Sequence, residues 1–164
     1  MATNRITEFL DGSRARYVVL IHSPAFSAQE VAESVHLPGR FFAKTVIVKI
    51  DGRLAMAVVP ATMEVNLGGL QEELGAHHVE LAEESEFADR FRGCQLGAVP
   101  PFGRLFGVDT YLDEELAGEE NIVFNAGTHS HAISMDFHEY RRLAHPRIYR
   151  ISRKPVERTR YAQI

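Results

Sequence analysis

Three short clusters in this sequence carry residue types that can bind or activate a substrate. The first is Lys44-Thr45, at the start of an apolar segment rich in β-branched residues. The second is the loop 97–103, which reads GAVPPFG, and the third is the segment 125–131, which reads NAGTHSH. They offer an ammonium group, a rigid main chain and a set of polar side chains, so the chemistry of each has to be considered separately.

The position of Lys44 in an expected strand decides what its ammonium can do. Along the segment 43–50, AKTVIVKI, side chains alternate between two faces, so Lys44 shares a face with Val46 and Val48. A lysine in such surroundings either extends its ammonium to water at the strand end or holds it in a pocket. In a pocket, the ammonium is a compact donor for a phosphate or carbonyl oxygen. Periodicity leaves both interpretations open.

The loop 97–103 offers main-chain groups in place of reactive side chains. Its glycines allow close approach of the backbone, while its two prolines fix φ and have no N–H of their own. The other amides can be presented to a ligand without reorganisation, as in a backbone oxyanion hole. These amides belong to Gly97, Ala98, Val99, Phe102 and Gly103. The alternative is a tight structural turn between a helix and a strand.

The histidines of the third cluster allow several roles. His129 and His131 have a His-x-His spacing, which on a strand places two imidazoles on one side and, with a third ligand, makes a zinc site. No nearby carboxylate or histidine has a recognisable ligand spacing, so a metal is the weakest reading. The others are a single substrate-contacting His129 and ordinary surface histidines.

Other common catalytic patterns are missing from the sequence. Ser23, Ser130 and Thr45 have no visible partners for a serine-hydrolase triad. There is no phosphate-binding loop and no dinucleotide fingerprint, so we expect no cofactor. The single cysteine, Cys94, excludes an internal disulfide and a thiolate zinc site, and is expected to be a small buried filler in a reducing compartment.

Length and composition predict one folded cytoplasmic domain. The chain has 164 residues, with 45% hydrophobic and 24% charged residues, and shows neither a membrane-spanning run nor a signal peptide. A net charge of −4 gives no general attraction to nucleic acid, so RNA has to be met through a local site or a partner. The basic segment 147–164 is expected to be a solvated tail or a phosphate-contacting arm after a domain of residues 1–146.

The expected elements indicate an α+β fold. The order lacks strict βαβ alternation, which predicts a mixed, curved, barrel-like sheet surrounded by helices. Asp51-Gly52 is a hairpin turn signal, and its two strands are expected at the centre of the sheet. The expected strands are 17–22, which reads as buried, 43–50, 54–59, 107–112, 121–125 and 131–136. The expected helices are one capped by Ser27 and Glu30, then 67–74, 83–91 and 137–144.

In order and spacing, the three clusters resemble one protein family. A Lys-Thr pair opening a strand, a Gly-x-x-x-Pro loop at 97–101 and an FNAG turn at 124–127 resemble the YbaK/ProX aminoacyl-tRNA deacylases. These are relatives of the editing domain of bacterial prolyl-tRNA synthetases, and the similarity covers roughly residues 17–146. It implies hydrolysis, in trans, of the ester between a wrong, small amino acid such as Ser, Thr or Ala and the terminal adenosine of a tRNA. The expected partners are mischarged tRNA and an aminoacyl-tRNA synthetase.

The resemblance also implies roles for particular residues. Lys44 is expected to contact a phosphate or the terminal ribose, and the loop amides, Gly97 first, to bind the substrate carbonyl. Because an ester carbonyl is already activated, such a site needs no strong base, metal or cofactor. The remaining expected pocket residues are Thr45, Ala98, Val99, Pro100, Pro101, Phe102, Asn125, Gly127 and His129.

Two functions from other classes stay open at this point. A non-catalytic module would use the same pocket to hold a tRNA 3′ end or a nucleotide, or to dock on a synthetase. A histidine-based metal hydrolase would lose activity with a chelator. The sequence does not determine the oligomeric state.

Overall fold

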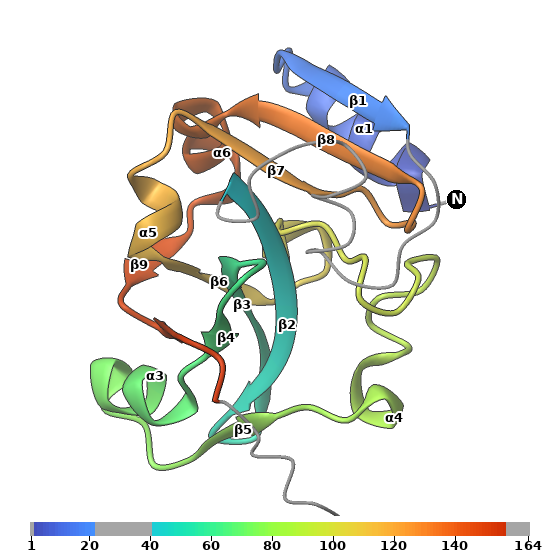
Figure 1. Ribbon diagram of the computed structural model, residues 1–164. Helices are drawn as coiled ribbons and strands as arrows, with labels where there is room; N and C mark the ends of the chain where they lie inside the picture. The colour runs from blue at the N-terminus through green and yellow to red at the C-terminus, as the bar shows by residue number, and fades with distance from the viewer. Residues whose placement is uncertain (1, 22–40, 157–164) are drawn as a thin grey trace, which may run out of the picture.

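The computed structural model describes residues 2–21 and 41–156 of the chain, and it has one mixed eight-stranded sheet with helices on its faces (Figure 1). The strands of this sheet are β1 (Tyr17–Ile21), β2 (Phe42–Ile50), β3 (Arg53–Pro60), β5 (Val79–Leu81), β6 (Asp109–Asp113), β7 (Asn121–Asn125), β8 (His131–Asp136) and β9 (Arg147–Tyr149). A separate two-stranded sheet pairs β4 (Glu64–Val65) with β10 (Ser152–Arg153). The helices are α1 (Ala2–Gly12), α3 (Leu67–Leu74), α4 (Glu84–Phe87), α5 (Glu114–Ala117), α6 (Phe137–Ala144) and the 3₁₀ turn η2 (Gly103–Leu105). The helix expected after Ser27 lies outside the described residues.

The strand order confirms the predicted α+β class with a mixed sheet. The order is β1-β8-β7-β2-β3-β6-β9, and β5 also pairs with β2. Pairs β2·β7, β3·β6 and β6·β9 are parallel, whereas the others are antiparallel. The central strand β2 is long and visibly curved in Figure 1. No helix among the described residues is long and apolar enough to cross a membrane.

The hairpin of β2 and β3 is confirmed at the centre of the sheet. Asp51 and Gly52 have φ of 49° and 82°, as a type I′ turn requires, and Ile50 pairs with Arg53 directly across it. The Asp51 carboxylate also accepts hydrogen bonds from the amides of His77 and His78, at 3.0 and 2.8 Å. One turn residue therefore ties the hairpin to the connection between α3 and β5.

Beyond the hairpin, β2 has an open stretch of edge that matters for the site. On the side opposite β3, the segment Phe42–Ala43 pairs with β7 and Val48–Ile50 pairs with β5. Within the described ranges, residues 44–47 have no strand partner on that side. The segment between α4 and the loop 97–103 lies over this gap, so the two predicted clusters meet there.

Three sequence predictions about elements need correction. Strand β1 is not buried: Val18 and Ile21 are 58% and 77% exposed, because β1 is the edge strand and pairs only with β8. Helix α4 ends at Phe87, and residues 88–93 form turns in place of the expected helix to Phe91. Strand β6 runs from Asp109 to Asp113, two residues after its predicted start.

The basic segment after Pro146 begins inside the fold. Its first residues form β9 and β10, and Ile151 is fully buried. The buried Asp113 carboxylate accepts hydrogen bonds from the amides of Ile151 and Ser152 at 2.8 and 2.9 Å. A solvated tail therefore does not start at Arg147, since the chain up to Arg153 is held in the two sheets.

Helix α1 is the main element that sequence patterning missed. Ile6 and Leu10 lie four residues apart on one helix face, and both are fully buried in the main core. Phe9 from the same helix packs edge-on against Phe102, with ring centroids 5.7 Å apart. The N-terminal helix therefore supports the back of the loop 97–103.

Candidate functional site

Four hydrogen bonds join the segment 95–98, which leads into the loop 97–103, to the third cluster. The amide of Gln95 donates to the carbonyl of Gly127 at 2.8 Å, and the amide of Gly127 donates to the carbonyl of Ala98 at 2.8 Å. The amide of His129 donates to the Gln95 side-chain oxygen at 2.7 Å. The His129 ring nitrogen Nε2 lies 2.6 Å from the Leu96 carbonyl, which only accepts, so Nε2 carries a proton. Two segments that are far apart in sequence thus form one rigid unit.

The loop begins with a tight turn from Gln95 to Ala98. The amide of Ala98 donates to the carbonyl of Gln95 at 3.0 Å, and Gly97, at the third turn position, has φ of 81°. This φ pattern is that of a type II turn, which favours glycine at that position. Gly97 is therefore required by the turn itself, in addition to any role toward a ligand.

Several loop amides that the sequence offered to a ligand are already used inside the protein. Ala98 donates within the turn, and the amide of Phe102 donates to the carbonyl of Pro100 at 2.8 Å. The amide of Gly103 donates to the hydroxyl of Thr110 at 2.9 Å in a buried position. These three amides are withdrawn from the candidate donors. Between described residues, the amides of Gly97 and Val99 make no hydrogen bond.

The two remaining amides point to the same side of the loop. The carbonyl of Leu96 is held by the His129 ring, and the carbonyl of Ala98 is held by the amide of Gly127. The peptide bonds are trans, so the N–H that shares a plane with each carbonyl points the opposite way. The amides of Gly97 and Val99 therefore both face away from the turn at 125–129.

A cavity of about 400 Å³ borders the loop, and both Gly97 and Val99 are among its lining residues. Its mainly apolar wall comes from β2, α4, the turn after α4 and the loop. Residues Thr45, Ile47, Phe87, Phe91, Gly97 and Val99 line it. Within the described ranges, none of residues 125–131 borders it. The structure thus brings together Thr45, Gly97 and Val99 from the predicted set.

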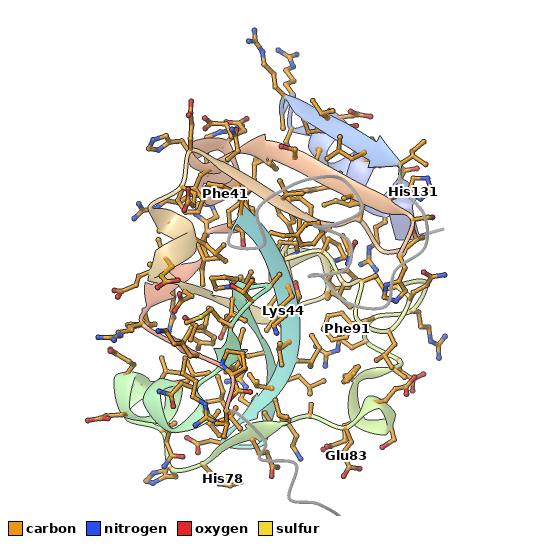
Figure 2. The ribbon with its side chains drawn as sticks, in the orientation of Figure 1. Phe41, Lys44, His78, Glu83, Phe91 and His131 are labelled. Carbon is orange, nitrogen blue, oxygen red and sulfur yellow. The ribbon has the colours of Figure 1, made fainter. Side chains whose placement is uncertain are left out.

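Lys44 lies beside this cavity and is not part of its wall. It is half-buried, and burial lowers the pKa of its ammonium, while the nearby charge of Glu64 partly opposes this shift. Figure 2 shows Lys44 on β2 and Phe91 on the segment alongside that strand. Alternation puts Lys44 on the face opposite Thr45, next to the open edge of β2, so a ligand in the gap can reach both side chains.

Asn125 is the last residue of β7, whose pairing with β2 ends one residue before Lys44. Parallel pairing places Phe42 beside Val123 and Ala43 beside Phe124, and the next residues along the two strands are Lys44 and Asn125. Asn125 is 5% exposed, and its side-chain oxygen has no hydrogen-bond partner among the described residues. An unsatisfied buried acceptor next to a half-buried cation is typical of a binding site.

Phe102 and the two prolines support the loop from behind. Phe102 is fully buried, with its ring centroid 5.5 Å from that of Phe124 and 5.1 Å from that of Tyr140. The Tyr140 hydroxyl donates to the carbonyl of Pro101 at 2.8 Å, and both prolines are buried. These three loop residues do not line the cavity, so they hold the loop in place and we no longer expect them to contact substrate.

The two histidines of the third cluster turn to different partners. The His129 ring contacts the Leu96 carbonyl, whereas His131 Nδ1 lies 2.9 Å from the Thr128 hydroxyl and 3.0 Å from the Ser130 hydroxyl. In the part of the chain that the structure describes, no three His, Cys, Asp or Glu side chains gather as a ligand set. The His-x-His spacing therefore does not place these rings around a common point.

Sequence reasoning missed three residues of the site: Gln95, Phe87 and Phe91. The two phenylalanines are four residues apart, and their rings pack at 6.0 Å, although the helix ends before the second. Gln95 lies two residues before the first glycine of the Gly-x-x-x-Pro loop, and its amide side chain was the only signal in the sequence. Cys94 also lines the cavity, and burial raises the pKa of its thiol, which keeps the group protonated.

The fold defines a class: a single-domain α+β protein with a mixed sheet, here with an apolar cavity beside the loop 97–103. The model of the aminoacyl-tRNA editing domain matches residues 22–143, and the chain belongs to that family. This result confirms the family expected from the three clusters.

Known relatives share most of the chain. A relative from Escherichia coli K12, the multifunctional Ser/Thr-tRNA deacylase ProXp-y, is 25% identical over 154 residues, covering 91% of this chain and 92% of its own length. The proline–tRNA ligase of Staphylococcus epidermidis is 32% identical over 111 residues, which are 67% of this chain and 19% of the ligase. A solved structure described as a candidate trans-editing enzyme for prolyl-tRNA synthetase has the same fold, with a TM-score of 0.78, 21% identity and coverage of 93% of this chain and 97% of its own.

Proposed function

We propose that this chain hydrolyses, in trans, the ester bond of tRNA that carries a wrong, small amino acid. The observation that carries this proposal is that Gly97 and Val99, whose amides make no hydrogen bond between described residues, both line an apolar cavity. Two fixed donors at one site match the needs of an oxyanion, the charge that develops when water adds to an ester carbonyl. Membership in the aminoacyl-tRNA editing family supports the same reaction.

In the proposed reaction, the substrate carbonyl oxygen accepts hydrogen bonds from both amides. Water adds to the carbonyl carbon, and the carbonyl π electrons move to the oxygen held by the amides. When the tetrahedral species collapses, the bond from carbon to the ribose oxygen breaks, and the ribose oxygen takes a proton that came from water. The products are the free amino acid and uncharged tRNA. The protein contributes positioning and charge stabilisation, for which an activated ester needs no strong base.

The amino-acid side chain is proposed to occupy the cavity. Phe87, Phe91 and Ile47 present an apolar surface next to Gly97, and about 400 Å³ is enough for a small side chain and part of the ester. Such a cavity rejects large residues by size but separates similar small ones by only about 1–3 kcal/mol per methylene. The activity named for the Escherichia coli relative, on Ser and Thr, agrees with this size. Thr45 is a hydroxyl on the wall that can contact a polar side chain.

Lys44 and Asn125 are proposed to bind the tRNA end next to the cavity. Across the open edge of β2, the Lys44 ammonium reaches a phosphate or ribose oxygen, and the unsatisfied oxygen of Asn125 accepts from a ribose hydroxyl or the α-ammonium. Both groups lie on the face of β2 opposite Thr45, so the acyl group and the nucleotide would occupy different sides of the gap. The partner is therefore the 3′ end of mischarged tRNA, with an aminoacyl-tRNA synthetase as a source of that substrate.

The test is release of the amino acid from a panel of charged tRNAs. We expect turnover of Ser-, Thr-, Ala- or Cys-tRNA, including mismatched pairs, and faster turnover of Phe-tRNA than of these would contradict the preference for a small amino acid. Tight binding with no hydrolysis across the panel would overturn the proposal in favour of a non-catalytic module. Loss of turnover in a chelator, together with stoichiometric metal in the purified protein, would favour a metal hydrolase.

A further inference from the structure

We infer that Gln95 is a positioning residue for the proposed reaction: it clamps the loop so that the amides of Gly97 and Val99 converge on one carbonyl oxygen. The inference rests on the proposed function and goes beyond it, because Gln95 itself touches no reacting atom. The rate of the proposed reaction would then depend partly on Gln95, whose neutral side chain lies outside the Gly-x-x-x-Pro motif.

Gln95 is the only residue of the loop region, among those described, that bonds through its amide, carbonyl and side chain at once. Its amide donates to the carbonyl of Gly127 at 2.8 Å, and its carbonyl accepts from the amide of Ala98 at 3.0 Å. Its side-chain oxygen accepts from the amide of His129 at 2.7 Å, across 34 residues of sequence. The loop and the turn therefore share this residue as their common anchor.

The side-chain bond controls the orientation of the first donor. His129 can hold the Leu96 carbonyl with its ring only while its own backbone stays where the Gln95 oxygen keeps it. If that backbone moves, the Leu96 carbonyl is released and the 96–97 peptide plane can rotate. The amide of Gly97 then loses its fixed direction, although its chemistry is unchanged. An interaction that acts on direction affects the transition state more than the bound substrate.

The direct test compares Gln95→Ala with wild type in steady-state deacylation of the best substrate in the panel. Misplacing a catalytic group by about 1 Å costs on the order of 10²-fold, so we expect kcat to fall by roughly 10- to 100-fold. Gln95 also borders the cavity, but Lys44 and the apolar wall of Phe87 and Phe91 are untouched, so we expect KM to change by less than about threefold. The matched control is Gln71→Ala, which also removes a side-chain hydrogen bond to a backbone group, the His77 carbonyl, on the α3 side of the molecule. It should leave both constants unchanged.

A second readout separates positioning from general stability and from the function itself. In Gln95→Ala, the ¹⁵N order parameters of Gly97 and Val99 should fall from rigid values near 0.85 to below about 0.6, with the core unaffected. Gln95→Glu keeps an acceptor at the same reach, so it should restore this order.

Three outcomes would overturn the inference. They are an unchanged kcat in Gln95→Ala, a loss confined to KM, and unchanged order at the two amides. Wild-type protein that hydrolyses nothing in the panel would remove the proposed function, while the NMR comparison would still decide whether Gln95 holds the loop.

Discussion

At the residue scale, the site has few reactive side chains because its donors belong to the backbone. Glycine and proline residues set the directions of those donors, and buried aromatic residues keep the loop from moving. Gly103 shows how tightly the loop is fitted, since a Cβ at this position would lie 2.2 Å from the Val108 carbonyl oxygen and 2.5 Å from the Thr110 hydroxyl. Lys44 is the exception: its side chain is charged and half-buried, and burial disfavours the charged form and lowers its pKa.

Replacing Lys44 should separate activity from stability. A charge-assisted hydrogen bond contributes about 1.5–3 kcal/mol, so Lys44→Met is expected to reduce kcat/KM by roughly 10- to 100-fold. Because burial lowers the folded-state pKa of Lys44, the unfolded chain holds this proton more tightly, and the charged form costs stability below the lowered pKa. The melting temperature of Lys44→Met should therefore equal or exceed that of wild type at pH 7, and the difference should shrink as the pH rises toward 10.5. Lys154→Met is the exposed control; a variant as active as wild type would contradict the role of Lys44.

Gly103→Ala should destabilise the fold by several kcal/mol, because its Cβ meets backbone atoms that cannot move aside cheaply. Urea denaturation measures this change. In Gly12→Ala the new methyl group would have no neighbour within 4 Å, so that variant should be neutral or slightly stabilising. Equal stability of the two variants would show that the contact at Gly103 relaxes freely.

At the element scale, β2 organises the site because its neighbours leave part of its edge uncovered. Local patterns predicted β2, β3, α3, β7, β8 and α6 well, since hydrophobic period and turn residues fix such elements within a few positions. They failed for β1, whose apolar residues look buried but lie at the edge of the sheet, because position in a sheet is a tertiary property. They also could not pair Gln95 with His129 or give the direction of an amide, which depends on contacts across 34 residues. Residue type and motif spacing were enough to predict site roles for Lys44, Gly97 and Asn125, and these roles stay predictions.

The turn between β2 and β3 should give the hairpin a measurable pH dependence. Hydrogen bonds from the amides of His78 and His77 lower the pKa of the Asp51 carboxyl below 3.8, so its stabilising effect is complete above that value and is lost as the pH falls through the lowered pKa. Asp51→Asn keeps a residue suited to positive φ but removes the charge. Its melting temperature should be lower than that of wild type at pH 7, and the two should converge as the pH falls through the lowered pKa of Asp51. A difference that stays constant from pH 7 to 2 would show that the carboxylate charge does not matter.

At the scale of the whole molecule, a net charge of −4 limits how the chain can hold a tRNA. The cavity is small and has few cationic residues. The basic residues up to Arg153 are partly engaged in contacts within the protein, as in the ion pair of Arg153 with Glu64. Recognition would therefore depend on the aminoacylated end more than on an extended phosphate surface. A domain of this kind benefits from a synthetase or another partner that delivers the substrate.

The salt dependence of KM tests how many tRNA phosphates the protein contacts. If only Lys44 and one further cation meet phosphates, log KM should rise with log salt with a slope of about 1–2 between roughly 50 and 200 mM KCl. A minimal substrate, aminoacyl-adenosine without phosphates, should show almost no slope. A slope of about 5 or more for aminoacyl-tRNA would mean that a wide basic surface takes part.

The main-chain origin of the two donors has a genetic consequence. Every amino acid except proline supplies the same N–H, so a substitution at Val99 changes the side chain that faces the acyl group while the donor itself persists. Substitutions in the cavity wall can then change the substrate preference step by step, without an inactive variant along the way. Inactivating mutations, in contrast, should cluster at positions that never meet the tRNA, such as Gln95, Gly103 and Tyr140.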